Sequence, residues 1–349
     1  MKRLVATTSL ACMILKLSLG CTAFCICSDS GNFLAKNLDW PVDAGLILVN
    51  RSGVQKSSFP VNGLTVSWTS RYSSLTFNQF GMEFPLGGMN EQGLVVEELN
   101  MPSMGGVQGQ PRAALNEFQI VQYILDNFST VGETERGMMH FHMVPLLVSL
   151  HYLVMDKSGG SMVMEFDGIR FQFHHSRDTG IPVLSNNLYR ESLRYLGNFR
   201  GFGGNLEVVR RPGSNERFVT VASMLYTEPA EAPVTRSIRI LKAVSQPDTR
   251  WSIVYDATHL IIYFKFHGCP DWKMLSLDRL FDLEAGYTLG ADVSDCRENP
   301  SAFFHPVSPE ENRALISGVF QQLTRDTGLE AGEEVSDQLA CYGSHYILH

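Results

Sequence analysis

Two short stretches near the N-terminus organise this chain: residues 19–24 read LGCTAF and residues 36–40 read KNLDW. An apolar leader ends on a small residue at Gly20, so cleavage after Gly20 would leave Cys21 as the first residue, with a free α-amine. A thiol with a pKa near ~8.5 would then lie beside an amine with a pKa near ~7.7 to 8.0, and the neutral amine could accept the thiol proton. We therefore predict that Cys21 supplies a nucleophile and a base together, without a histidine.

Residues 1–20 have the composition of a secretory signal peptide. Positions 2 and 3 are basic, 4–15 are mostly apolar, and positions 18 and 20 are small. Lys16 interrupts the apolar run and disfavours a retained membrane helix, which needs about twenty mostly apolar residues. We expect an exported protein, periplasmic or secreted, with no stable membrane span and with residues 21–349 forming one domain.

The composition is that of a globular protein that does not bind nucleic acid. The 349 residues are 44% hydrophobic and 18% charged, and the formal net charge is −8. Nucleic-acid-binding domains usually carry a basic patch or stripe. The sequence has no such Lys/Arg run, so we expect no nucleic-acid partner.

The cysteines after Cys21 fall into two groups. Cys25 and Cys27 have strand spacing and point to the same side as Cys21, either as small core residues or as metal ligands. The core interpretation is favoured, because no Cys or His pair at ligand spacing matches them. An exported chain can form disulfides, and we allow one bridge, with no pairing assigned, among the three distant cysteines. These are Cys269, Cys296 and Cys341.

Hydrophobic patterns predict a layered α+β fold. Residues 22–27 and 33–37 form a hairpin around a turn at 28–32, and Gly87-Gly88 belongs to a turn between later strands. Further strands are expected at 46–50, 64–69, 75–78, 94–99, 148–155, 161–166, 251–257 and 260–266. Helices are expected at 113–128, 133–139, 189–196, 216–226, 237–244 and 306–323, followed by an acidic loop around Glu333-Glu334. Strands at both ends of the chain with helices between them suit paired sheets covered by helices.

Several motifs, taken in order, resemble the choloylglycine hydrolase family, which includes bile salt hydrolases and penicillin V acylases. Besides the two opening stretches they comprise 88–94 (GMNEQGL), 99–102 (LNMP), 184–186 (LSN), 216–219 (ERFV) and the strand pair of 251–263. Members of this family are N-terminal nucleophile hydrolases. The resemblance implies a four-layer αββα sandwich and hydrolysis of linear amide C–N bonds.

The resemblance also implies roles for particular residues. Asp39 matches the aspartate that orients the N-terminal amine. Asn100 and Asn186 match positions that contribute to the oxyanion hole, and Arg217 matches an arginine that polarises the site. Read without the family, these side chains would be turn residues and a solvated helix charge.

Lys36 departs from the pattern, because bile salt hydrolases usually carry an arginine there. Either cation favours a thiolate, but lysine lacks the planar fork of arginine. We therefore assign Lys36 to substrate binding, with a solvated strand lysine as the alternative.

The implied substrates are conjugated bile salts, penicillin V and N-acyl homoserine lactones. Each joins an apolar acyl part to a polar amine, and neither a metal nor an organic cofactor is implied. The oligomeric state is not readable from the sequence, although family members are often homotetramers.

A second hypothesis makes the chain a membrane-anchored binding lipoprotein with a lipidated Cys21. The Gly20-Cys21 junction suits it, but Ser18 stands where such a signal prefers a large aliphatic residue. Lipidation with acylation of the amine would remove the base. It would also leave Asp39 and Arg217 without a role, so we rank it below the amidase.

Overall fold

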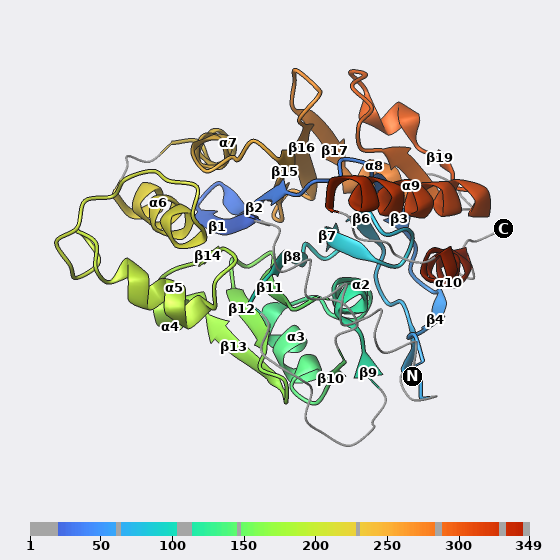
Figure 1. The fold of residues 1–349 in the computed structure, drawn as a ribbon, viewed down its shortest axis with the longest axis horizontal. Helices are drawn as coiled ribbons and strands as arrows, with labels where there is room; N and C mark the ends of the chain where they lie inside the picture. The colour runs from blue at the N-terminus through green and yellow to red at the C-terminus, as the bar shows by residue number, and fades with distance from the viewer. Residues whose placement is uncertain are drawn as a thin grey trace.

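The computed structural model describes residues 20–60, 64–102, 114–144, 148–227, 231–282, 288–327 and 333–344. The expected signal peptide lies outside these ranges, apart from Gly20. Two large antiparallel sheets dominate the fold (Figure 1).

The first sheet, sheet A, is built around the hairpin of residues 21–40. Its strand order is β14 (Val183–Leu184), β1 (Thr22–Ser28), β2 (Gly31–Asp39), β15 (Thr249–Asp256), β16 (Ile261–Phe266) and β17 (Lys273–Ser276). The predicted hairpin is confirmed, with Ala23 paired to Lys36. Gly31 occupies the turn at φ 137°, a backbone conformation that favours glycine. Strands from both ends of the chain therefore meet in one sheet.

The second sheet, sheet B, has nine strands. Their order is β13 (Phe171–His175), β12 (Ser161–Phe166), β11 (Leu150–Met155), β8 (Val95–Asn100), β7 (Pro85–Asn90), β6 (Ser74–Asn78), β3 (Leu46–Asn50), β18 (Leu289–Asp292) and β19 (His305–Pro306). Two small ribbons lie outside the large sheets: β4 (Gln55–Ser57) with β5 (Ser67–Thr69), and β9 (Ala114–Leu115) with β10 (His142–Met143).

Helices cover the outer face of each sheet. Helices α5 (Tyr189–Leu196), α6 (Ser214–Thr227) and α7 (Pro233–Ala243) lie on the sheet A side, and α2 (Ile120–Asn127) and α3 (Val131–Met138) lie on the sheet B side (Figure 1). The remaining helices are η1 (Glu117–Gln119), α4 (Ser176–Thr179), α8 (Leu277–Phe281), η2 (Pro300–Phe303), α9 (Pro309–Thr327) and α10 (Glu333–Ser344). The expected four-layer αββα sandwich is confirmed.

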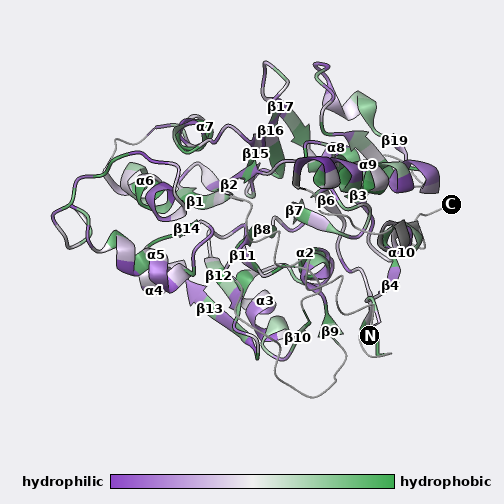
Figure 2. Ribbon diagram, viewed as in Figure 1, coloured by the Kyte–Doolittle hydropathy of each residue, from purple (hydrophilic) through white to green (hydrophobic). Residues whose placement is uncertain are grey.

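Apolar side chains fill the spaces between these layers. Between the sheets, Phe77 of sheet B contacts Trp251, Tyr255 and Phe264 of sheet A. A separate buried cluster, including Ile124, joins α2 to the outer face of sheet B. Helix α9 shows hydrophobic and hydrophilic residues side by side, as expected for a helix that covers a core (Figure 2).

One predicted turn and one predicted loop were wrong. Gly87-Gly88 is not a turn but lies inside the fully buried strand β7. Glycine is needed at both positions because neighbouring atoms occupy the space that a side chain would fill. Glu333-Glu334 begins helix α10 instead of lying in a loop.

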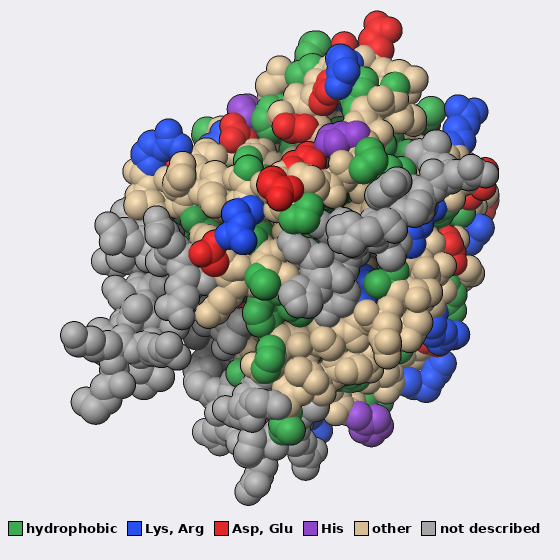
Figure 3. Space-filling view, turned by 90° about the vertical axis from the view of Figure 1, so that its right-hand side faces the viewer, with side chains coloured by type: hydrophobic (Ala, Val, Ile, Leu, Met, Phe, Trp, Pro, Cys, Tyr) green, Lys and Arg blue, Asp and Glu red, His purple; other side chains and the backbone are tan. Residues whose placement is uncertain are grey.

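The sequence allowed one disulfide among the three distant cysteines, and the structure pairs Cys269 with Cys296. The bridge joins the segment between β16 and β17 to the segment that follows β18. Within the described ranges, no helix combines the length and the apolar character needed to cross a membrane. On the described part of the face shown in Figure 3, basic and acidic side chains are interspersed and form no basic stripe.

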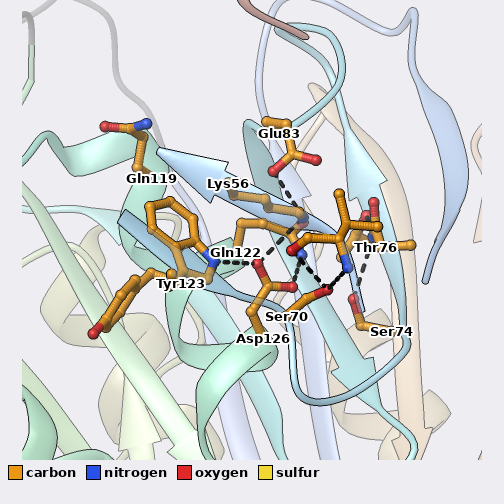
Figure 4. A network of polar contacts seen from close by, with 12 residues as sticks. Lys56, Ser70, Ser74, Thr76, Glu83, Gln119, Gln122, Tyr123 and Asp126 are labelled. Carbon is orange, nitrogen blue, oxygen red and sulfur yellow. Dashed lines mark hydrogen bonds and ion pairs between the residues drawn. The ribbon is translucent and has the colours of Figure 1, made fainter. Parts of the chain in front are cut away.

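A buried charge network fastens β4 to α2 (Figure 4). The ammonium of Lys56 lies 2.9 Å from a Glu83 carboxylate oxygen and 3.2 Å from an Asp126 oxygen. Trp68 and Gln122 also donate hydrogen bonds to Asp126, each at 2.8 Å. Glu83 adopts φ 69°, which is uncommon for a residue other than glycine. The network therefore holds the segment around β4 through buried charges, in addition to aromatic contacts such as that of Trp68 with Tyr123.

Candidate active site

Cys21 lies at the start of β1, in the layer between the two sheets, and is 5% exposed. Because Ala23 pairs with Lys36, Cys21 shares one face of sheet A with Lys36. Burial raises the pKa of the Cys21 thiol to about 11, and the nearby Lys36 ammonium opposes that shift. In a chain that continues through Gly20, the thiol is therefore held protonated.

Asp39, the last residue of β2, is fully buried beside this thiol. Its backbone acts to lower the pKa of the Cys21 thiol, whereas its carboxylate charge acts to raise it. Of its carboxylate oxygens, Oδ1 accepts a hydrogen bond from the Thr249 hydroxyl at 2.5 Å, whereas Oδ2 has no partner among the described residues. Burial raises the pKa of Asp39 to about 7, although Thr249 and Arg217 act in the opposite direction.

Arg217 projects from α6 to the same point and is 3% exposed. Its guanidinium donates to the Thr22 hydroxyl at 2.9 Å, to the Cys21 carbonyl at 3.3 Å and to Asn186 Oδ1 at 2.8 Å. A Cβ built on Gly20 would lie 3.1 Å from a guanidinium nitrogen. The residue before Cys21 therefore lies directly against Arg217.

Asn186 follows β14, which pairs with β1 through Ala23 and Leu184. This register brings Asn186 opposite Cys21. Its side-chain amide accepts from Arg217 and donates to the Asn100 carbonyl at 2.9 Å. Both asparagines are half-buried, and Asn100 ends β8 of the other sheet. Sheet B therefore reaches the neighbourhood of Cys21 in sheet A through the Asn100–Asn186 contact.

Lys36 lies behind the thiol rather than at an exposed position. Its side chain is 1% exposed, and its ammonium contacts Glu97 at 2.6 Å and donates to the Leu86 carbonyl at 3.3 Å. The other Glu97 oxygen accepts from the Tyr255 hydroxyl at 2.5 Å. Burial alone would lower the pKa of Lys36, but the charge and hydrogen bond of Glu97, together with the charges of Cys21 and Glu98, raise that pKa. The burial of Lys36 contradicts the solvated strand lysine that we considered, whereas its assignment to substrate binding stays a prediction.

The structure thus brings all six predicted site residues together and adds two that the sequence reasoning missed. Glu97 and Thr249 contact Lys36 and Asp39, respectively. A charge inside the apolar strand 94–99 was a usable signal for Glu97, since a buried charge needs a partner. Thr249 had no comparable signal, because its contact depends on a strand more than two hundred residues away from Asp39 in the sequence.

Three histidines form ion-pair contacts with glutamates outside this cluster. His151 and His174 approach opposite oxygens of Glu165, at 3.1 and 3.5 Å, and His175 approaches Glu135 at 3.0 Å. In the ranges that the structure describes, no group of three or more His, Cys, Asp or Glu side chains could hold a metal ion. Cys25 is buried, as its interpretation as a core residue predicts, whereas Cys27 is exposed, so the same interpretation is wrong for Cys27.

Comparisons with known proteins agree with this arrangement. The chain is 25% identical, over 374 aligned positions, to penicillin V acylase from Pectobacterium atrosepticum; the match covers 90% of this chain and 98% of the relative. The fold matches the structure of penicillin V acylase from Agrobacterium tumefaciens with a TM-score of 0.71 at 23% identity, covering 82% of this chain and 98% of that one.

A mutant of conjugated bile acid hydrolase from Clostridium perfringens matches with a TM-score of 0.62 at 17% identity, over 74% of this chain and 93% of that one. These neighbours have the N-terminal nucleophile hydrolase fold, and so does this chain. The family model for linear amide C–N hydrolases of the choloylglycine hydrolase family matches residues 21–209, more than half of the chain. The protein therefore belongs to the choloylglycine hydrolase family of linear amide C–N hydrolases.

Proposed function

We propose that this protein is an exported amidase in which Cys21 becomes an N-terminal nucleophile once residues 1–20 are removed. The observation that carries the proposal is the unpartnered Oδ2 of buried Asp39. A buried carboxylate oxygen without a partner is costly. The α-ammonium created by cleavage at Gly20 would supply the missing donor and a compensating charge.

The reaction follows from the same geometry. The free α-amine accepts the Cys21 thiol proton, and the sulfur attacks the amide carbonyl to form a tetrahedral intermediate. Asn186 Nδ2 has a second proton besides the one donated to Asn100, and we assign this proton and the Asn100 amide to the developing oxyanion. The intermediate collapses, the α-ammonium gives its proton to the departing amine, and water then hydrolyses the thioester.

The charged neighbours prepare this chemistry. Arg217 holds the Asn186 amide by its oxygen, so that the amide nitrogen faces Asn100. Lys36 lies close enough to the thiol to favour its ionised form, and its ion pair with Glu97 keeps Lys36 protonated. We therefore propose an electrostatic role for Lys36 behind the nucleophile.

Before cleavage the site would be inactive. The nitrogen of Cys21 is then an amide and cannot act as a base, and burial keeps the thiol pKa at about 11. Removal of the leader would create the base and supply Asp39 with its partner in one step. This dependence supports a role for leader removal in activation.

Among amide substrates we propose penicillin V first. The similarity to two penicillin V acylases supports it, while conjugated bile salts and N-acyl homoserine lactones are alternatives of the same chemical class. All three present a linear amide between an apolar acyl group and a polar amine.

Export is supported by the Cys269–Cys296 disulfide, because such bonds persist in oxidising compartments. The alternative of a lipidated Cys21 fits poorly with the burial of this residue, which is 5% exposed. A diacylglyceryl group on that sulfur would need space in the core between the sheets.

Two measurements test the proposal. N-terminal analysis and intact mass of the exported protein should show an unmodified Cys21 with a free amine; a lipid adduct or a blocked amine would contradict the amidase. Amine release from penicillin V, a conjugated bile salt and an N-acyl homoserine lactone should be abolished by Cys21→Ala with folding retained. Persistent turnover in that variant would mean that another residue is the nucleophile.

A further inference from the structure

The two oxygens of the Asp39 carboxylate have different surroundings. Oδ1 accepts the short hydrogen bond from Thr249, and Oδ2 is buried without a partner among the described residues. A carboxylate that must bind an amine needs one oxygen kept free and aimed. The group that holds the other oxygen therefore decides which one remains available.

The direction of the Thr249 hydroxyl proton follows from its second contact. The backbone N–H of Gln246 donates to Thr249 Oγ1 at 2.7 Å, and an N–H can only donate. One lone pair of the hydroxyl therefore faces Gln246, and its proton is free for Asp39. An ionised carboxylate has no proton to give, so Thr249 is the donor to it.

The backbone around Thr249 is held firmly in place. The Thr249 N–H donates back to the Gln246 carbonyl at 3.1 Å, and the pairing of β15 with β2 shifts register just after Thr249. Trp40 N–H donates to the Asp248 carbonyl at 3.0 Å, and the Arg250 guanidinium donates to the Trp40 carbonyl at 2.7 Å. The residues on either side of Thr249 are thus fastened to the residue that follows Asp39.

We propose that Thr249 is a positioning residue for the amidase reaction: its hydroxyl holds Oδ1 of Asp39, so that Oδ2 receives the Cys21 α-amine. This inference rests on the proposed N-terminal nucleophile function. Thr249 touches neither the substrate nor the reacting sulfur, and it acts through Asp39 alone.

Other charged groups also face Asp39, and their effects need to be separated from that of Thr249. They are Arg217 of α6, Lys36 of β2, Asp248 before β15 and the Cys21 thiol with its future α-amine. Arg217 and Lys36 lower the pKa of Asp39, whereas Asp248 raises it. None of these groups is altered by a change at Thr249, so the hydroxyl can be tested by itself.

Thr249→Val replaces the hydroxyl by a methyl group of similar size. We expect the acid limb of the kcat/KM profile to move up by about one pH unit, with a roughly tenfold loss of kcat/KM at pH 6, because a carboxyl without this donor ionises less readily. Thr249→Ser retains the hydroxyl and should restore the limb. The acid limb of Cys21 alkylation by iodoacetamide should shift with it, a readout that needs no substrate.

Ser252→Ala is the matched control. Ser252 lies on the same strand and donates to Asn37 Oδ1 at 2.6 Å, so it also joins β15 to β2 but does not contact Asp39. Its pH profiles should equal those of the unaltered protein. Penicillin V is the substrate, and melting temperatures are measured for every variant; if the valine variant does not fold, Thr249→Ala is judged by the same criteria.

The outcomes separate this inference from the function on which it rests. If Cys21→Ala and Asp39→Asn abolish turnover but the folded hydroxyl-free variant keeps the original pH limbs, Thr249 has no positioning role. A serine variant that behaves like the hydroxyl-free variant would likewise overturn it, since the effect would then be steric. Turnover that persists in Cys21→Ala would instead refute the nucleophile assignment.

Discussion

Gly87 and Glu97 stand directly opposite each other on β7 and β8, and the Glu97 carboxylate occupies the space where a side chain on Gly87 would begin. That same carboxylate holds the Lys36 ammonium behind Cys21. Glycine in a buried strand costs stability by itself. Gly87 is nevertheless needed here, because it leaves room for the Glu97 carboxylate that pairs with Lys36.

Gly87→Ala should accordingly displace Glu97 and weaken its ion pair with Lys36. We expect a loss of roughly 1–3 kcal/mol in the free energy of unfolding, as for overpacked cores, together with lower kcat. Gly318→Ala in α9 is the control, because nothing lies within 4 Å of its added Cβ; it should leave activity unchanged. Denaturant unfolding and amine release measure both effects, and full stability in the Gly87→Ala variant would contradict the packing argument.

Lys36→Met should leave Glu97 buried without its counter-charge. Breaking a buried pair costs about 3–5 kcal/mol, whereas replacing both partners by apolar residues is often neutral. We therefore expect Lys36→Met/Glu97→Leu to regain most of the lost stability but not the activity, because the thiol still lacks its cation. If the double variant were as active as the original protein, Lys36 would have no electrostatic role.

Asp39→Asn should have opposite effects on the stability of the uncut and the mature protein. In the uncut chain burial raises the pKa of Asp39 from 3.8 to about 7. The folded state therefore binds more protons between these values, and stability falls as pH rises through the window. A chain that begins at Gly20 should gain roughly 2–4 kcal/mol at pH 8 from the substitution, and less at pH 5.

In the mature protein the α-ammonium should stabilise the ionised Asp39, so the same substitution should destabilise it. Thermal unfolding of both forms at pH 5 and pH 8 tests this reversal. Equal effects in both forms would mean that the amine of Cys21 does not reach Asp39.

The Lys56 network should be essential for stability although it lies outside the site. Lys56→Met leaves the carboxylates of Glu83 and Asp126 facing each other in the core, and we expect a loss of about 3–5 kcal/mol. The exposed Lys242 of α7 is the control, since its change to Met should stay within about 0.5 kcal/mol. Similar melting temperatures for the two variants would contradict the role of the network.

Loss of the Cys269–Cys296 bridge should lower stability without affecting turnover. A sequence separation of 27 residues corresponds to roughly 3 kcal/mol in the chain-entropy view. The variant with serine at both positions should therefore melt lower, and a reducing agent should lower the melting temperature of the original protein but not that of the variant. A reductant effect of equal size in both proteins would assign it to other thiols.

Local patterns in the sequence were enough to predict the hairpin that follows Cys21, about half of the strands and paired sheets covered by helices. Alternation, turn residues and helical spacing report on neighbours along the chain, and sheet A indeed begins with the predicted hairpin. The resemblance to a family identified Cys21, Asp39 and Arg217 as one group, and the structure brings them together.

The tertiary structure alone decided how these residues are held. Thr249 reaches Asp39, and Glu97 reaches Lys36, only because strands distant in sequence pair or stack at a particular register. Gly87 was predicted to lie in a turn because glycine is common in turns. Its position in a strand depends on the Glu97 carboxylate, which occupies the space beside it, and the sequence does not reveal that contact. Register, stacking and burial set the charges around Cys21, and these depend on contacts that no local pattern encodes.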